Sequence, residues 1–89
     1  MKISPNIEKA LREAGWPLPE ITLEKLIEKC PSEIRDAEGR VHHFMLGARD
    51  GGWIATYWKG AFVDTHGPNP KEAVARLWLA LPEEERVKC

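Results

Sequence analysis

Cysteine is scarce in this 89-residue chain, and long apolar runs are absent. The two cysteines, Cys30 and Cys89, form no C-x-x-C pair and no grouping with histidine at the spacing of a zinc site. No stretch approaches the ~20 apolar residues that a membrane-spanning helix needs, and the first residues lack the apolar region of a signal peptide. We therefore expect a cytoplasmic protein that has no contact with a membrane.

Excess charge and catalytic motifs are also lacking. The formal net charge of −1 excludes binding to duplex nucleic acid through bulk charge alone, although a local basic patch remains open. The glycines form no phosphate-binding spacing, and Cys30 follows an apolar helix face, where core packing explains it. Adjacent His42 and His43 point to opposite faces of a strand, and His66 has too few co-ligands for a metal. We predict no catalytic residue, no cofactor and no metal, and so no enzyme.

So short a chain cannot build two separate cores, and its 43% hydrophobic and 30% charged residues are ordinary for a soluble globular domain. We predict one α+β domain over residues 1–89, an antiparallel meander with helices packed on it. The expected element order is α-α-β-β-β-α. Its parts are a helical region at 1–31, a sheet at 32–66, a helix at 69–81 and a charged tail at 82–89.

Two short helices are predicted in the first third of the chain. Ser4 and Pro5 suit the start of the first helix, and Gly15 can adopt the left-handed conformation that ends it. Thr22 caps the second helix, and Pro31 ends it. Each helix has one apolar stripe at i, i+3, i+4, i+7 spacing. The stripes are Ile7, Ala10, Leu11 and Ala14, then Leu23, Leu26, Ile27 and Cys30.

A third helix has the clearest signals. Asn69 caps it, Pro70 takes the first position, and Glu72 completes a capping box by reaching back to the Asn69 backbone. Pro82 stops it. Leu79 lies nearly opposite its apolar face, beside Glu72, where water is expected. The apolar face consists of Ala73, Val74, Leu77, Trp78 and Leu81.

Strands are predicted at 40–49, 53–59 and 61–65. Asp50-Gly51 indicates a type I′ hairpin turn, because both central positions need positive φ. The pairs are then Ala48 with Trp53, Leu46 with Ala55, and Phe44 with Tyr57. A three-residue loop that includes Gly52 would slip the first strand by one residue and exchange its faces.

Two further pairings complete the sheet. A tight turn at Lys59-Gly60 would place Tyr57 opposite Phe62 and Ala55 opposite Asp64. The turn composition of 36–39 allows a fourth strand, with 33–35 pairing with 40–42. The meander therefore has three strands, or four if this pairing forms.

Both faces of this sheet carry large apolar side chains, so we expect both to be covered. One face carries Phe44, Leu46, Trp53, Tyr57 and Phe62, and the other carries Val41, His43, Met45, Ile54, Thr56, Trp58 and Val63. If every helix packs on the first face, the second becomes an exposed apolar surface that needs a partner. Our candidate interface residues are Trp58, Met45, Ile54 and Leu79.

A second candidate surface is basic. The stretch from Arg40 to Lys71 has four Lys or Arg against two Asp. Arg40, Arg49 and Lys59 beside exposed Trp58 or Tyr57 would form a stacking platform for single-stranded nucleic acid. The alternative is that most of these aromatics form the core, and we favour it because the chain offers little other core material.

About half of the chain resembles a known kind of protein. Gly52-Trp53-Ile54-Ala55-Thr56-Tyr57, a strand, and then Gly67-x-Asn69-Pro70-x-Glu72-Ala73-x-x-x-Leu77-x-x-Ala80-Leu81 resemble small phage and prophage proteins of the phage ABA sandwich kind. The second half is also similar to the G-x-T-x-x-E-A-x-x-x-L-x-x-A-L ending of HicB-type antitoxins, with Asn69-Pro70 in place of their usual threonine cap. The first resemblance brings no site residues, and the second implies toxin binding through the sheet and helix.

These observations favour a small non-enzymatic binding module of phage or prophage origin. We expect a protein partner or a homodimer. The alternatives are a single-stranded nucleic-acid binder that uses the sheet face, which we do not favour, and an antitoxin-like protein that binds a toxin.

Overall fold

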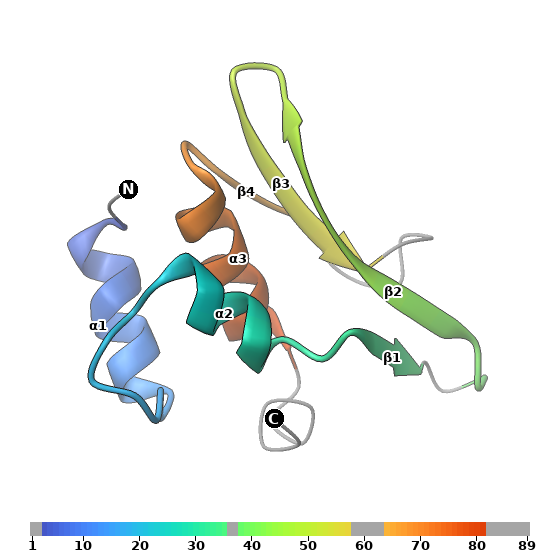
Figure 1. Cartoon of the computed structure of the whole chain (residues 1–89), viewed down its shortest axis with the longest axis horizontal. Helices are drawn as coiled ribbons and strands as arrows, with labels where there is room; N and C mark the ends of the chain where they lie inside the picture. Colours follow the sequence, from blue (N-terminus) through green and yellow to red (C-terminus); the bar gives the residue numbers. More distant parts are fainter. Residues whose placement is uncertain (1–2, 36–37, 58–63, 82–89) are drawn as a thin grey trace.

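The computed structural model of the chain describes residues 3–35, 38–57 and 64–81. These residues form three helices and four strands, which confirms the α+β class and adds the fourth strand (Figure 1). In chain order the elements are α1 (Pro5–Glu13), α2 (Leu23–Lys29), β1 (Glu33–Arg35), β2 (Val41–Arg49), β3 (Gly52–Tyr57), β4 (Asp64–Gly67) and α3 (Pro70–Ala80).

The strands form one antiparallel sheet in the order β1-β2-β3-β4. Asp50 and Gly51 both have positive φ, +45° and +81°, as a type I′ turn requires. The turn pairs Arg49 with Gly52, so the two-residue loop is confirmed and the three-residue alternative is wrong. β1 pairs with the start of β2, so the fourth strand forms, but its partners are residues 41–43 instead of the predicted 40–42, with Arg35 opposite Val41.

The register between β3 and β4 differs from the prediction by one residue. Ala55 pairs with Thr65, and Thr56 pairs with Asp64. The predicted register would have placed Asp64 opposite Ala55, which is completely buried, and burying a carboxylate there is costly. The slip turns the Asp64 carboxylate to the other face, where Thr56 Oγ1 donates to Asp64 Oδ1 at 2.6 Å. The predicted turn at Lys59-Gly60, and Phe62 and Val63, lie outside the described residues.

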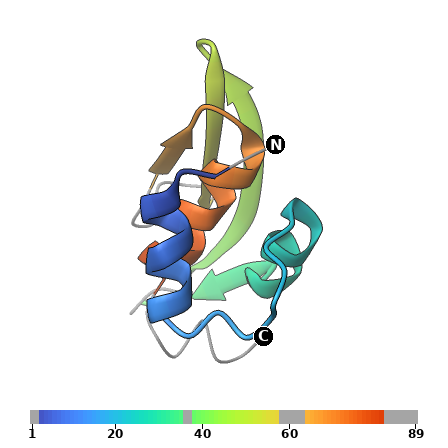
Figure 2. The ribbon, with the colours of Figure 1, turned by 90° about the vertical axis from the view of Figure 1, so that its left-hand side faces the viewer.

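All three helices lie on one side of the sheet (Figure 1). α3 lies on β2, β3 and β4, and α1 and α2 pack against α3. The view in Figure 2 shows α1 in front of α3 and α2 beside it, with the β2–β3 hairpin behind. Among the described residues no helix covers the opposite side of the sheet. This arrangement differs from our expectation that both faces are covered.

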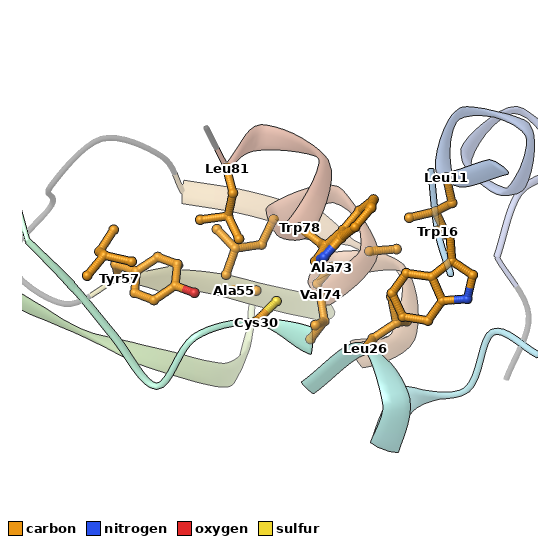
Figure 3. Packing of buried hydrophobic residues seen from close by; sticks show 13 residues of the cluster. Leu11, Trp16, Leu26, Cys30, Ala55, Tyr57, Ala73, Val74, Trp78 and Leu81 are labelled. Atoms are coloured by element: carbon orange, nitrogen blue, oxygen red, sulfur yellow. The ribbon is translucent and has the colours of Figure 1, made fainter. Parts of the chain in front are cut away.

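The core runs from the sheet through α3 to the first helix and its connector (Figure 3). Trp78 is only 3% exposed and makes an edge-to-face contact with Trp16 at a ring-centroid distance of 5.3 Å. Tyr57 is buried on the sheet side, and its hydroxyl donates to the Pro31 carbonyl at 2.9 Å. The predicted apolar face of the last helix is confirmed, since all its members are buried: Ala73, Val74, Leu77, Trp78 and Leu81.

The helices differ from prediction in two details. Glu72 and Ala75, which lie outside the predicted apolar face of α3, are buried as well, because α3 lies between the sheet and the other two helices. Ile27, predicted in the buried stripe of α2, is 38% exposed. The seven-residue α2 packs chiefly on α3, so its buried stripe is narrower than the spacing suggests.

Two residues of β4 let α3 approach the sheet closely. A Cβ on Gly67 would lie 2.8 Å from the Ala73 nitrogen, so only glycine fits here without displacing backbone. Thr65 Oγ1 lies 2.9 Å from the Ala73 carbonyl oxygen and 3.0 Å from that of Ala55, and it can donate its proton to either. β4 is thereby joined to both α3 and β3.

Candidate functional site

The open face of the sheet, defined here as the side opposite α3, is the first candidate site. The register places the odd-numbered residues of β2 and the even-numbered residues of β3 and β4 on it. Met45 is 43% exposed, and Ile54 and Val41 are half-buried. Met45 pairs with Thr56, so Ile54 is its diagonal neighbour on the next strand. The middle of this face is therefore apolar.

Polar and charged side chains, which include Glu33, Arg35 and Asp64, border these apolar residues. On the β1 side, His43 Nδ1 lies 3.9 Å from Glu33 Oε2. On the β4 side, Asp64 and His66 occupy the same face. A central apolar area with a polar, mixed-sign border is the usual composition of a protein–protein interface.

The predicted interface residues do not form one surface. Met45 and Ile54 come together on the open face as expected. Leu79 lies on α3, on the other side of the sheet, and is partly buried against the core, so it offers no contact surface beside Met45. Trp58 lies outside the described residues.

The predicted basic patch does not form one surface either. Arg40 directly precedes β2 and Arg49 ends it, so the nine residues of that strand separate them by roughly 30 Å. Arg40 also forms an ion pair with Glu38 at 2.7 Å. Lys59 lies outside the described residues. Tyr57, one of the aromatics considered for base stacking, is 1% exposed and faces α3.

A cavity of about 670 Å³ lies at the tip of the β2–β3 hairpin, where the hairpin projects past the end of β4. We call it the hairpin-tip cavity. Its walls come from the hairpin turn, from the end of β4 with the following residue, and from α3. The side chains along these walls include those of Arg49, Asp50, Trp53, His66 and Arg76. Three glycines, at positions 51, 52 and 67, leave backbone exposed along the same walls.

A buried carboxylate holds one of these side chains. Glu72 is 4% exposed, and its Oε1 accepts a 2.8 Å hydrogen bond from the Ser4 backbone N–H, at the start of α1. Its Oε2 lies 3.6 Å from Arg76 Nη2. The Ser4 hydrogen bond is the main reason why the pKa of Glu72 lies below its ordinary value; Arg76 adds to it and burial opposes it. Arg76 is therefore oriented by an ionised group that is fixed in turn.

The same contact gives Glu72 a further partner beyond the predicted capping box. Asn69 Oδ1 accepts from the Glu72 backbone N–H at 2.9 Å, which confirms the cap. The Glu72 carboxylate, however, joins the start of α1 to α3 through Ser4. A capping pattern read from sequence describes local partners, and here the partner lies 68 residues away.

His42 and His43 lie on opposite faces of β2, as strand alternation predicts. His42 is 4% exposed on the helix-covered face, and His43 is exposed on the open face. His66 lies on β4, at the border of the hairpin-tip cavity. Across the described ranges, no group of three or more His, Cys, Asp or Glu side chains gathers as a metal site would require.

Sequence reasoning missed the hairpin-tip cavity because its walls come from three separate stretches. Arg49 and Trp53 flank the predicted turn, so their proximity could have been foreseen. The proximity of Arg76 to them could not have been foreseen, because it depends on the close approach of α3 to Gly67.

Comparison of the chain with models of protein families, with curated proteins and with solved structures gave no match in any of the three. None of the described helices has the length and apolar character needed to cross a membrane.

Proposed function

We propose that this chain is a small non-enzymatic binding module that docks a protein on the open face of its sheet. The observation that supports this is Met45, a large apolar side chain 43% exposed beside Ile54 on a face without a described helix. Exposed apolar area that forms a contiguous group on a small domain is characteristic of an interaction surface.

The chemistry of the open face favours a protein over single-stranded nucleic acid. Base stacking needs exposed aromatic rings. Tyr57, Phe44 and Trp53 all belong to the helix-covered face, and no aromatic residue among those described lies on the open one. Glu33 and Asp64 also place negative charge where a polyanion would have to bind.

The occupant that this face fits is a second copy of the chain. A two-fold interface places the same surface on both partners, so it must be complementary to itself. A face with carboxylates and with arginine and histidine around an apolar centre meets this condition, because opposite charges can be matched across the axis. The charged residues are Glu33, Arg35 and Asp64, and the polar His43 and His66 lie beside them.

The resemblance to phage ABA sandwich proteins makes a phage or prophage origin part of the same proposal. The similarity to HicB-type antitoxins points to a related role, since those proteins bind a toxin through a sheet and helix.

Sedimentation equilibrium tests the proposal. We expect a concentration-dependent dimer, and we expect Met45→Glu to shift it to monomer, because each copy would bury an unpaired charge at the centre of the interface. Ile27→Glu is the matched control, since Ile27 is also exposed and apolar but lies on α2, on the helix side.

Three results would contradict the proposal. A wild-type chain that stays monomeric up to about 1 mM has no self-association of useful strength. Equal dissociation by Met45→Glu and Ile27→Glu would place the interface elsewhere. A dimer that Met45→Glu leaves intact would do the same.

A further inference from the structure

The hairpin-tip cavity combines features of a small-molecule site and lies apart from the apolar centre of the open face. Its volume of about 670 Å³ falls within the range of ligand pockets, roughly 300–1,000 Å³. Such pockets combine an apolar or aromatic wall with a few fixed polar groups.

The polar groups of the cavity favour an anion. Arg49 and Arg76 both line it, together with His66. The carboxylate that lines it belongs to Asp50, whose side chain is 95% exposed and lies 3.9 Å from Arg49 Nε. An ion pair so exposed is worth little, so an incoming anion can displace it.

Arg76 is the more strongly positioned of the two arginines. Glu72 holds it from the buried side, while the Arg76 side chain is 46% exposed. A guanidinium has five N–H donors, so one ion pair does not saturate it. Two planar guanidinium groups on one cavity suit phosphate oxygens, which arginine binds in a bidentate manner.

Trp53 adds an aromatic wall. It packs partly against the core, so its ring is held in place, and it also lines the cavity. Gly51, in the hairpin turn, leaves open space beside the cavity, because a Cβ there would meet no atom within 4 Å. An aromatic surface does not stabilise a bound inorganic anion, whereas a nucleobase is stabilised by stacking on an indole ring.

From this combination we infer that the hairpin-tip cavity binds a nucleoside phosphate, with the phosphates at Arg49 and Arg76 and the base at Trp53. Arg49 and His66 come from the open face of the sheet, and Trp53 and Arg76 from the helix side, so the cavity lies where the two faces meet at the sheet edge. The inference does not depend on Met45 and Ile54, and it concerns a small ligand rather than a protein partner.

An NMR titration of the ¹⁵N-labelled chain with ADP tests this, with inorganic phosphate and adenosine titrated separately. We expect ADP to shift the backbone amides of Gly51, Gly52 and Gly67 with a Kd of about 1 mM or tighter. Phosphate alone and adenosine alone should each bind at least about tenfold more weakly, since each uses half of the site.

Variants assign the roles. Arg49→Ala and Arg76→Lys should each weaken ADP binding by about tenfold, because each removes a bidentate contact. Arg76→Lys retains a positive charge near Glu72, so the fold is expected to survive. Arg40→Ala, an arginine at the other end of β2, is the control and should leave ADP binding unchanged. Trp53→Leu should reduce ADP binding to the level of phosphate.

The result that would overturn the inference is an absence of shifts in these amides at 10 mM ADP, or equal weakening by Arg49→Ala and Arg40→Ala. Equal affinity for ADP and phosphate would refute the role of Trp53 and with it the assignment to a nucleoside phosphate.

Discussion

The two faces of the sheet differ both in composition and in what they contact. On the face toward α3, Ala55 and Tyr57 are at most 1% exposed. On the open face, Met45 is 43% exposed, although it lies on the same strand pair. The covered face also carries the aromatic side chains Phe44, Trp53 and Tyr57, whereas the charged residues Glu33, Arg35 and Asp64 lie on the open face.

Backbone shape and hydrogen bonding separate the two faces. Gly67 and Thr65 both lie on the covered face, and they provide a close approach and a hydrogen bond to α3. The open face has Gly47 in β2, but a Cβ there would meet no atom within 4 Å. α3 therefore docks on the face where Gly67 permits a close approach and Thr65 provides a hydrogen bond.

The largest expected effect concerns the covered face. Trp78→Ala should lower the free energy of unfolding by about 3–5 kcal/mol, because Trp78 is 3% exposed and packs edge-to-face on Trp16. Met45→Ala on the open face should change it by less than about 0.5 kcal/mol when measured on dilute monomer. Urea denaturation of both variants provides the measurement. Similar losses from the two variants would show that the faces are not distinct.

A smaller loss of stability is expected where the backbone of α3 approaches β4 at Gly67. Gly67→Ala should cost about 1–3 kcal/mol, since the new Cβ must move the backbone of α3. Gly47→Ala makes the same chemical change on the open face and should stay within about 0.5 kcal/mol. Thermal or urea unfolding of this matched pair measures the difference. A neutral Gly67→Ala would mean that α3 can move away from β4 at no cost.

Local signals in the sequence predicted most of the fold. Capping residues such as Asn69 predicted where helices begin, and Asp50-Gly51 predicted the hairpin and its register, because turn geometry depends on only a few residues. The β3–β4 register was not predictable in this way. It depends on Thr65 contacting α3 and on Asp64 avoiding the core, and both are tertiary effects.

The candidate sites were less predictable than the fold. Strand alternation placed Met45 and Ile54 together, because alternation depends on register alone. Helix periodicity placed Leu79 and Glu72 in water, but the position of α1 and α2 against α3 determines their burial. The pairing of Arg49 with Arg76 in one cavity joins elements that no sequence pattern links.

The smallest expected effect concerns the contact between Glu72 of α3 and Ser4, which joins α1 to the covered side of the sheet. Glu72→Gln should cost about 1 kcal/mol at pH 7, because the amide oxygen can still accept from Ser4 but the charge that strengthens this bond and the contact with Arg76 is lost. The pKa of Glu72 is lowered from 4.5 in the folded protein, mainly by the Ser4 N–H, so the unfolded chain binds a proton more readily. The ionised carboxylate therefore stabilises the fold fully above pH 4.5, and this contribution is lost as the pH falls through the lowered folded value. Urea denaturation across this pH range should show that the difference in free energy of unfolding between wild type and Glu72→Gln becomes smaller toward acid pH.

Glu33→Gln, on the open face with a partner 3.9 Å away, is the control, and its free energy of unfolding should stay within about 0.5 kcal/mol of wild type. A difference for Glu72→Gln that does not change with pH would show that the contact with α1 depends on shape and not on the charge of Glu72.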